Sequence, residues 1–132
     1  MSNSKRVFVS YDHSDSEFAS ELADQLAKVG VRPWLDKKEL KPGGSWEEQI
    51  KDALGSSDAV VLLLSAGKPS ANVLVEAGAA LSRGIEIVPV LLDSKADAGI
   101  FSERSQVRAD REVKPENAAK EIAEIVGRQT KR

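Results

Sequence analysis

The spacing of apolar and polar residues changes several times along the chain, and each spacing predicts one kind of secondary structure. Short runs rich in β-branched and aliphatic residues predict strands. These runs are residues 6–10, 31–35, 58–64 and 86–92, with a weaker one at 106–109. Apolar residues three or four positions apart predict helices between the runs. The expected helices are residues 14–29, 45–54, 70–83 and 115–126.

Two of the predicted helices begin with a capping box. In S-D-S-E (14–17) and S-W-E-E (45–48), a serine and a glutamate are spaced to bond the free amides of a first helical turn. Gly30 and Gly84 follow the last apolar positions of two helices. A glycine in the left-handed conformation commonly ends a helix, so we expect both to act as stops.

Strands that alternate with helices predict right-handed β–α–β crossovers and a parallel sheet with helices on both faces. Residues 58–64 (D-A-V-V-L-L-L) are almost continuously apolar, which is typical of a central strand covered on both faces. Pro33 predicts an edge strand for the second run, because proline cannot donate a ladder hydrogen bond. We therefore expect an α/β, flavodoxin-like fold with about five strands, in one domain over residues 1–132 whose ends, 1–5 and 129–132, are frayed.

Composition excludes several classes of function. The 19 Lys and Arg and 21 Asp and Glu residues are interspersed, so we expect no basic stripe for DNA or RNA. The chain has no cysteine and one histidine, His13, which excludes thiolate nucleophiles and histidine metal clusters. The apolar runs 59–64 and 87–92 are too short to cross a membrane. Residues 1–6 lack the apolar core of a signal peptide, so we expect a cytoplasmic protein.

Glu76 is the only charged residue between Pro69 and Ser82, in the third predicted helix. In an open sheet of strand order 2-1-3-4-5, ligands bind beyond the carboxyl ends of the first and third strands. That crevice would be lined by residues 10–13 and 65–67. The third helix begins at the mouth of the crevice, and Glu76 lies roughly 9 Å along it.

Two interpretations of Glu76 stay open at this point. It is either the solvated edge of an amphipathic helix or a carboxylate that points into a site. No lysine or arginine occurs in the helix before Arg83, which favours the second interpretation. We expect Glu76 to border the core beside small residues. The residues expected to form the seam against the sheet are Leu74, Ala77, Gly78 and Leu81.

The commoner ligand motifs of this fold class are absent from the sequence. No G-x-G-x-x-G follows a strand, and no G-x-x-x-x-G-K-[ST] occurs. The third strand leads to Ser65, where a phospho-acceptor domain would need an aspartate. No G-x-S-x-G elbow is present to carry the nucleophile of a hydrolase triad.

Six segments nevertheless occur in the order and at the spacings of one protein family. They are V-F-V-S-Y (7–11), W-L-D (34–36), K-P-G-G with the following S-W (41–46), S-S-D-A-V-V-L-L-L-S (56–65), V-E-A-G-A-A-L (75–81) and I-V-P-V-L-L-D (87–93). Together they resemble a Toll/interleukin-receptor (TIR) domain of the compact bacterial kind. The resemblance covers residues 5–93 by motif and the rest by general layout. It implies a flavodoxin-like fold and one of two functions.

The first implied function is enzymatic. Many bacterial and plant TIR domains cleave NAD at the nicotinamide–ribose bond, releasing nicotinamide and ADP-ribose or a cyclic variant. The position that matches their catalytic glutamate is Glu76, with NAD as the substrate and no separate cofactor. The other substrate-binding positions implied by the resemblance are Tyr11, Asp12, His13, Asp36 and Trp46. Alternatively, Trp46 anchors the second helix in the core, and His13 is a loop residue rather than a catalytic base.

The second implied function is assembly. Other TIR domains are noncatalytic and act by associating with one another, chiefly through the loop that matches residues 36–45. The partners implied are therefore other TIR domains. For a catalytic domain, a separate effector would respond to the nucleotide product, as in bacterial antiphage signalling.

One carboxylate is enough for the enzymatic chemistry. Nicotinamide leaves a cationic pyridinium as a neutral molecule, so no general acid is needed to protonate it. Ordinary glycosidases use a second carboxylate for that step. Stabilisation of an oxocarbenium-like ribose, or positioning of its hydroxyls, remains, and Glu76 suits either task.

The sequence departs from the catalytic pattern at one position. Catalytic TIR domains often carry a tryptophan four residues before the glutamate, where this chain has Asn72. We expect Asn72 to face the substrate, with a stacking wall either absent or supplied by a neighbouring subunit. The arrangement N-V-x-x-E-A-G-x-A-L is also similar to that of nucleoside 2-deoxyribosyltransferases, which use a glutamate as the nucleophile at an anomeric carbon. An N-ribosyl transferase is therefore a third hypothesis.

Overall fold

A computed structural model of the chain describes residues 5–35, 46–65, 71–92, 107–108 and 114–128. Its elements follow the predicted alternation of strands and helices. In chain order they are β1 (Arg6–Ser10), the 3₁₀ turn η1 (His13–Asp15), α1 (Ser16–Lys28), β2 (Arg32–Leu35), α2 (Trp46–Gly55), β3 (Ala59–Leu64), α3 (Ala71–Ser82), β4 (Glu86–Leu91), β5 (Val107–Arg108) and α4 (Pro115–Arg128).

The strands form one parallel sheet in the order β2-β1-β3-β4-β5, which confirms the flavodoxin-like fold. All six residues of β3 are buried, as expected for the central strand. β2 lies at the edge, where Pro33 is tolerated. β5 contributes only two residues to the opposite edge. The chain passes from β1 to β2 on one side of β1, and from β2 it crosses to β3 on the other side, so the strand order reverses between β1 and β3.

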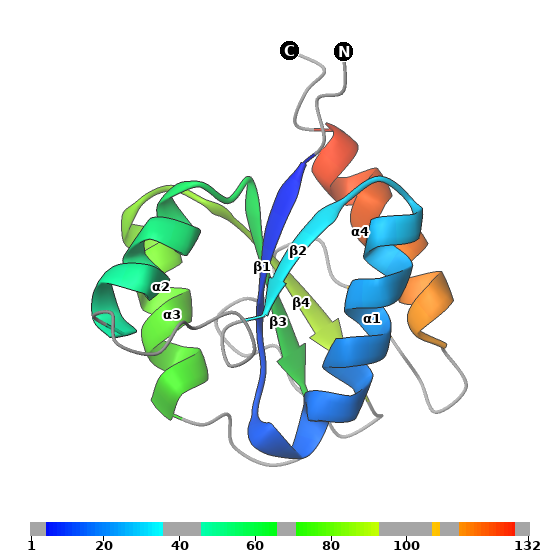
Figure 1. The fold of residues 1–132 in the computed structure, drawn as a ribbon, viewed down its shortest axis with the longest axis horizontal. Helices are drawn as coiled ribbons and strands as arrows, with labels where there is room; N and C mark the ends of the chain where they lie inside the picture. The colour runs from blue at the N-terminus through cyan, green and yellow to red at the C-terminus, as the bar shows by residue number, and fades with distance from the viewer. Residues whose placement is uncertain (1–4, 36–45, 66–70, 93–106, 109–113, 129–132) are drawn as a thin grey trace.

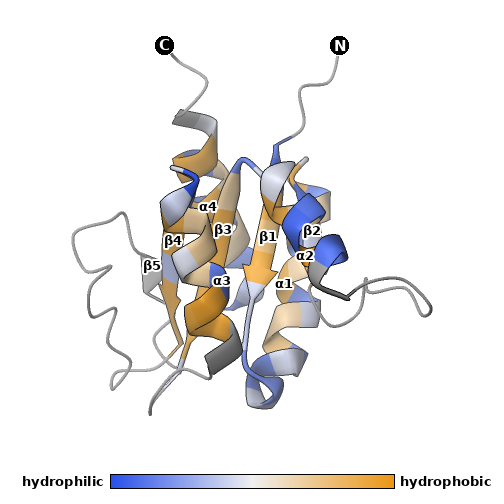
Figure 2. Cartoon of the chain, turned by 90° about the vertical axis from the view of Figure 1, so that its left-hand side faces the viewer, coloured by the Kyte–Doolittle hydropathy of each residue, from blue (hydrophilic) through white to orange (hydrophobic). Residues whose placement is uncertain are grey.

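Helices cover both faces of this sheet: α1 and α4 lie on one face, and α2 and α3 on the other (Figure 1). Successive strand residues point to opposite faces. Val7 and Val9 therefore belong to the core cluster beneath α1 and α4, whereas Phe8 belongs to the cluster beneath α2 and α3. Figure 2 shows hydrophobic residues on the strands and along much of α3. Among the helices of the described residues, none is long and apolar enough to cross a membrane.

The helix ends agree with the sequence at the glycines and differ at the first capping box. Gly30 and Gly84 have φ of 85° and 69°, the left-handed conformation expected of helix stops. The predicted capping box at residues 14–17 is wrong, because α1 begins at Ser16 after a 3₁₀ turn. The N–H of Asp15 donates to the carbonyl of Asp12 over 2.8 Å, which closes that turn. Residue 45, the start of the second predicted box, lies outside the described residues.

Candidate functional site

Two polar side chains meet in the interior at the carboxyl end of β1. Ser10 is 0% exposed and Glu76 is 3% exposed, and in the described part of the chain they are the buried polar or charged residues. The Ser10 hydroxyl donates to Oε1 of Glu76 over 2.5 Å. The other carboxylate oxygen, Oε2, is also withdrawn from solvent. A carboxylate inside the protein is costly unless it is hydrogen-bonded, so this contact needs a physical or a functional explanation.

Backbone geometry brings the two residues together. Ser10 points to the same face of the sheet as Phe8, two positions earlier, and that face is covered by α2 and α3. On α3 the buried stripe runs at helical spacing and includes the carboxylate. Its members are Val73, Glu76, Ala77 and Ala80. Glu76 thus points at the sheet, and the interpretation as a solvated helix edge is wrong.

The predicted seam of α3 is wrong in part. Leu74 is 53% exposed and Leu81 is 38% exposed, and Gly78 is exposed as well. Ala77 alone of the predicted seam is buried. Small alanines bring the helix close to the sheet, and Glu76 then reaches the end of β1. The larger leucines are consequently left on the outside of the helix.

Ser10 and Glu76 lie where open α/β sheets bind their ligands. Ser10 is the last residue of β1 and pairs with Leu62 of β3. The strand order reverses between these two strands, and ligands in such folds bind outside the carboxyl ends at that reversal. The carboxylate therefore lies at the expected end of the sheet, on the side covered by α2 and α3.

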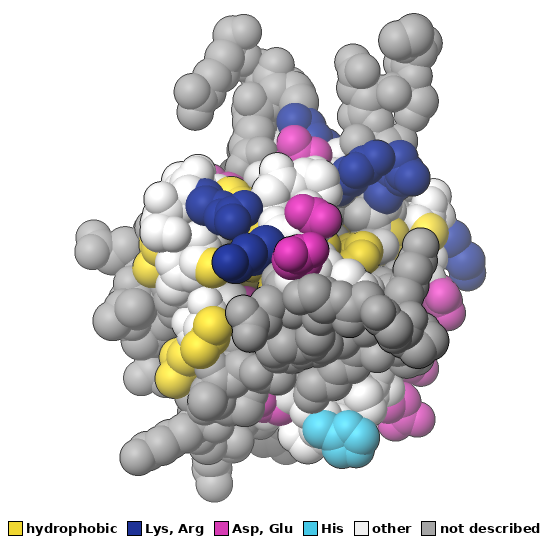
Figure 3. All heavy atoms as spheres, turned by 60° about the vertical axis from the view of Figure 1, so that its left-hand side comes forward, with side chains coloured by type: hydrophobic (Ala, Val, Ile, Leu, Met, Phe, Trp, Pro, Cys, Tyr) yellow, Lys and Arg dark blue, Asp and Glu magenta, His cyan; other side chains and the backbone are white. Residues whose placement is uncertain are grey.

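The residues after β1 that were predicted to line the site do not all lie on the same side of the sheet. Tyr11 is 1% exposed and packs in the cluster beneath α1 and α4, on the face opposite Glu76. Asp12 is half-buried just before η1, and His13 is exposed (Figure 3). Alternation along the backbone sends Tyr11 to the face opposite Ser10, and the 3₁₀ turn η1 then begins at His13. Roles of these side chains toward a substrate stay predictions.

Three further predicted positions lie outside what the structure describes. They are Asp36 and the side chains of Trp46 and Asn72. An aromatic pair that sequence reasoning did not assign to the site is on the same face as Ser10. Phe8 and Trp34 stack with ring centroids 4.9 Å apart and an interplanar angle of 24°. Trp34 belongs to the W-L-D segment noted in the sequence. It pairs with Phe8 in the sheet, and the two side chains therefore share a face.

A second serine–carboxylate pair follows β3. The Ser65 hydroxyl donates to Oδ2 of Asp15 over 3.1 Å, joining the end of β3 to the start of α1. Both residues are half-buried. Among the described residues no group of three or more His, Cys, Asp or Glu side chains could hold a metal ion.

One groove among the described residues lies elsewhere. It is an open hollow of about 710 Å³ between α1 and the start of α4. Acidic and basic side chains both line it, including Glu21, Lys28 and Lys114. Neither Ser10 nor Glu76 belongs to it. The carboxyl end of β1, with its buried carboxylate, is the better candidate because it combines polar chemistry with the strand reversal.

Comparisons with known proteins agree with this fold. The TIR domain of the Toll-related receptor TRR-2 from Hydra magnipapillata has a TM-score of 0.66 at 17% identity, over 94% of this chain and 93% of that one. The TIR domains of the activated Roq1 resistosome, which recognises the effector XopQ, have a TM-score of 0.61 at 21% identity, over 97% of this chain and 74% of that one. The CMP N-glycosidase BcmB of Clostridium botulinum has a TM-score of 0.62 at 19% identity, over 92% and 99%.

These identities are low, so the structural likenesses show the fold alone. Among curated proteins, none matches the chain by sequence. The family model described as the TIR domain matches residues 7–126, which is most of the chain. That match spans the described strands except Arg6, the first residue of β1, and all but the last two residues of α4. The protein therefore belongs to the TIR domain family.

Proposed function

We propose that this TIR domain is an NAD glycohydrolase that cleaves the nicotinamide–ribose bond, with Glu76 as the catalytic residue. The observation that carries the proposal is the burial of the Glu76 carboxylate at the carboxyl end of β1, bonded to Ser10. A leucine or alanine there would pack on the same face of α3 without the cost of desolvating a carboxylate. The presence of a charge-bearing group at this buried position points to chemistry rather than packing.

The reaction breaks the bond between the ribose anomeric carbon and the pyridinium nitrogen. The bonding electrons stay with nicotinamide, which leaves as a neutral molecule, and positive charge develops on the ribosyl group. Glu76 opposes that charge in a water-poor interior, where electrostatic stabilisation is strongest. Water then attacks the anomeric carbon and loses a proton to give ADP-ribose, or a nitrogen of the adenine ring attacks to give a cyclic product.

Relatives of similar fold support the bond class and the mode of activation. BcmB is by name an N-glycosidase of CMP, so this fold accommodates cleavage of a bond between a ribose carbon and a ring nitrogen. The Roq1 TIR domains occur in an assembled resistosome. Because Glu76 is only 3% exposed in the isolated chain, substrate access requires a local rearrangement. We place that rearrangement in self-association, and the nucleotide product would signal to a separate effector in bacterial defence.

The test is NAD consumption at high protein concentration, with and without a crowding agent, followed by chromatography of the products. The Glu76→Ala variant is assayed beside the parent chain, and both are melted to confirm folding. We expect nicotinamide and either ADP-ribose or a cyclic form from the parent chain, and none from the variant. Absence of turnover at every concentration, or turnover retained in a folded Glu76→Ala, would overturn the proposal.

A noncatalytic assembly module is the second candidate, and the outer face of α3 favours it. Leu74, Val75 and Leu81 are 53%, 69% and 38% exposed, and hydrophobic side chains are visible on this side of the surface (Figure 3). Exposed apolar groups of this kind often mark contacts with other proteins. Concentration-dependent association without NAD turnover would select this candidate. Supplying free nucleosides in the same assay would reveal a ribosyl transferase, which needs no NAD.

A further inference from the structure

We propose that Ser10 is a positioning residue that orients the Glu76 carboxylate for the reaction. The inference rests on the proposed function of Glu76 and adds a second residue to the same site. Ser10 acts through Glu76 and need not touch the substrate. The contact that carries the inference is the 2.5 Å hydrogen bond from the Ser10 hydroxyl to Oε1, formed between residues far apart in the sequence.

Ser10 is anchored much more firmly than the side chain it contacts. It ends β1, and its Cα is in register with Leu62 of the central strand β3. The preceding residue, Val9, pairs on both sides, with Leu35 of β2 and Val61 of β3. One side-chain torsion places the oxygen of a serine, whereas three torsions place the oxygens of a glutamate carboxylate. A rigid strand end thus restricts a flexible carboxylate, which is the arrangement that precise sites require.

The chemistry of the bond suits a carboxylate that must stay ionised. A hydroxyl that donates to a carboxylate favours its charged form over its neutral form. The charged form is the one that opposes positive charge on the ribosyl group. Ser10 engages Oε1, and a carboxylate can accept several hydrogen bonds through its two oxygens. One bond can therefore set the orientation of the group while the carboxylate also meets a ligand.

A purely structural role for Ser10 makes different predictions. In that case the hydroxyl is only a satisfied polar group in the core, and its loss would change the melting temperature alone. A positioning role changes kcat and the pH dependence as well, because the charged form of Glu76 loses a donor. The pH profile and the titration of Glu76 therefore separate the two roles.

The experiment compares Ser10→Ala, Ser10→Thr and the matched control Ser57→Ala. Ser57 donates its hydroxyl to the carbonyl of Ala53 over 2.6 Å, near the end of α2 and away from Glu76. Ser57→Ala thus removes a hydroxyl hydrogen bond of similar length that does not involve the Glu76 carboxylate. NAD turnover is followed against pH well below each melting temperature, and the Glu76 carboxyl is titrated by carbon-13 NMR in each protein.

We expect Ser10→Ala to lower kcat by about 100-fold, the scale on which small misplacements of a catalytic group act, with KM for NAD nearly unchanged. The acid limb of its kcat profile should move to higher pH, and the NMR titration should show that the pKa of Glu76 rises. Ser10→Thr keeps the hydroxyl and should recover most of the turnover. Ser57→Ala should match the parent chain in both measurements.

Parent-like kcat and titration in Ser10→Ala would overturn the inference and leave the proposed function standing. So would an equal loss in Ser10→Ala and Ser10→Thr with no change in titration, because that pattern signals packing alone. If the parent chain turns over no NAD, the proposed function fails and the catalytic inference fails with it. The NMR titration would still report whether Ser10 controls the ionisation of Glu76, so the two failures are distinguishable.

Discussion

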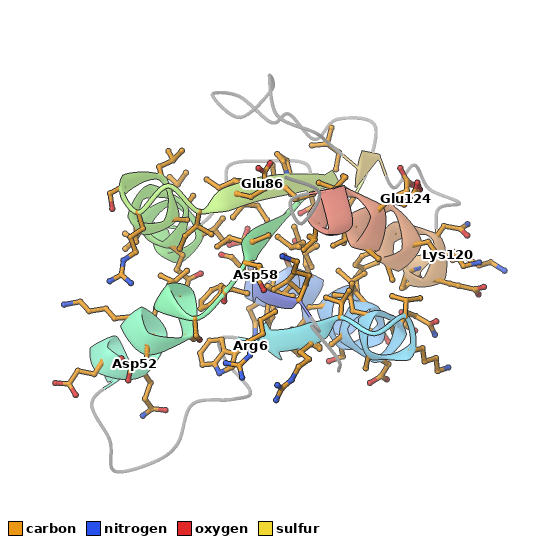
Figure 4. The ribbon with its side chains drawn as sticks, turned by 90° about the horizontal axis from the view of Figure 1, so that it is seen from above. Arg6, Asp52, Asp58, Glu86, Lys120 and Glu124 are labelled. Atoms are coloured by element: carbon orange, nitrogen blue, oxygen red, sulfur yellow. The ribbon has the colours of Figure 1, made fainter. Side chains whose placement is uncertain are left out.

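β1 is hydrogen-bonded to a carboxylate at each of its ends, and these two carboxylates differ in their exposure to solvent. At the amino end, Asp58 accepts the N–H of Arg6 over 2.8 Å through Oδ2, and its own N–H donates to the Arg6 carbonyl over 2.7 Å. Its Oδ1 lies 3.9 Å from Nζ of Lys5, and its side chain is 39% exposed. Figure 4 shows Arg6 and Asp58 together at this end. At the carboxyl end, Glu76 is 3% exposed and bonded to the Ser10 hydroxyl.

The difference shows which carboxylate has a structural explanation. Asp58 satisfies a backbone donor at the start of β1 while it keeps part of its hydration, so the fold benefits at little desolvation cost. Glu76 has lost nearly all its hydration in a stripe that is otherwise valine and alanine. Burial of a carboxylate in such surroundings costs free energy that apolar residues would not. We therefore expect Asp58 to matter for stability and Glu76 for activity.

The sharpest test of this comparison is activity. Glu76→Ala should reduce NAD turnover by at least about 10³-fold, because it removes the group that opposes charge in the transition state. Asp58→Ala should leave turnover per folded molecule unchanged, since its contacts are at the other end of the sheet. Both variants are assayed well below their melting temperatures. Equal losses in the two variants would break the comparison.

The next largest effect is on stability. Asp58→Ala should lower the free energy of unfolding by about 1 kcal/mol, because a charge-assisted bond to the Arg6 N–H is lost from a partly exposed site. For a chain of this size, that corresponds to a fall in Tm of about 4 °C. Asp58→Asn keeps an acceptor for the same N–H and should lose less. Denaturant titration of both variants measures the difference, and an unchanged Asp58→Ala would contradict it.

A stability change of opposite sign is expected at the carboxyl end. Glu76→Gln keeps an oxygen to accept the Ser10 hydroxyl and removes the carboxylate that burial disfavours. It should raise the free energy of unfolding by about 0.5–1 kcal/mol, in the manner of functional groups retained at the expense of stability. Thermal and denaturant melts of Glu76→Gln and the parent chain measure this. A less stable Glu76→Gln would show that the carboxylate itself supports the fold.

The fold could be predicted well because residues that mark the ends and edges of its helices and strands are clear in the sequence. The almost continuous apolar run at residues 58–64 matches the central strand, and Pro33 correctly indicates an edge. Gly30 and Gly84 end their helices as expected. These features depend on local backbone chemistry, which a single sequence records directly. The predicted capping box at residues 14–17 was wrong because a 3₁₀ turn occupies residues 13–15 and α1 begins only at Ser16. The local S-D-S-E pattern does not contain that turn.

The site was harder to predict because it depends on orientation. α3 is apolar on nearly every side, so hydrophobic spacing could not decide which face meets the sheet, and Leu74 was assigned to the wrong one. The expectation that Glu76 borders the core was correct. Residues 10–13 were expected to act together, although strand alternation sends Ser10 and Tyr11 to opposite faces. The importance of Ser10 needed the position of α3, which no local pattern contains.

The smallest expected effect concerns the cation beside Asp58. Lys5 Nζ lies 3.9 Å from Oδ1, and the two side chains are 22% and 39% exposed. Ion pairs in such settings contribute about 0–1 kcal/mol, so Lys5→Ala should change the free energy of unfolding by less than about 0.5 kcal/mol. Added salt should erase that difference, because screening weakens the attraction between exposed charges. A larger or salt-independent loss would mean that the ion pair, rather than the Arg6 N–H, holds Asp58 in place, and Asp58→Asn would then lose as much stability as Asp58→Ala.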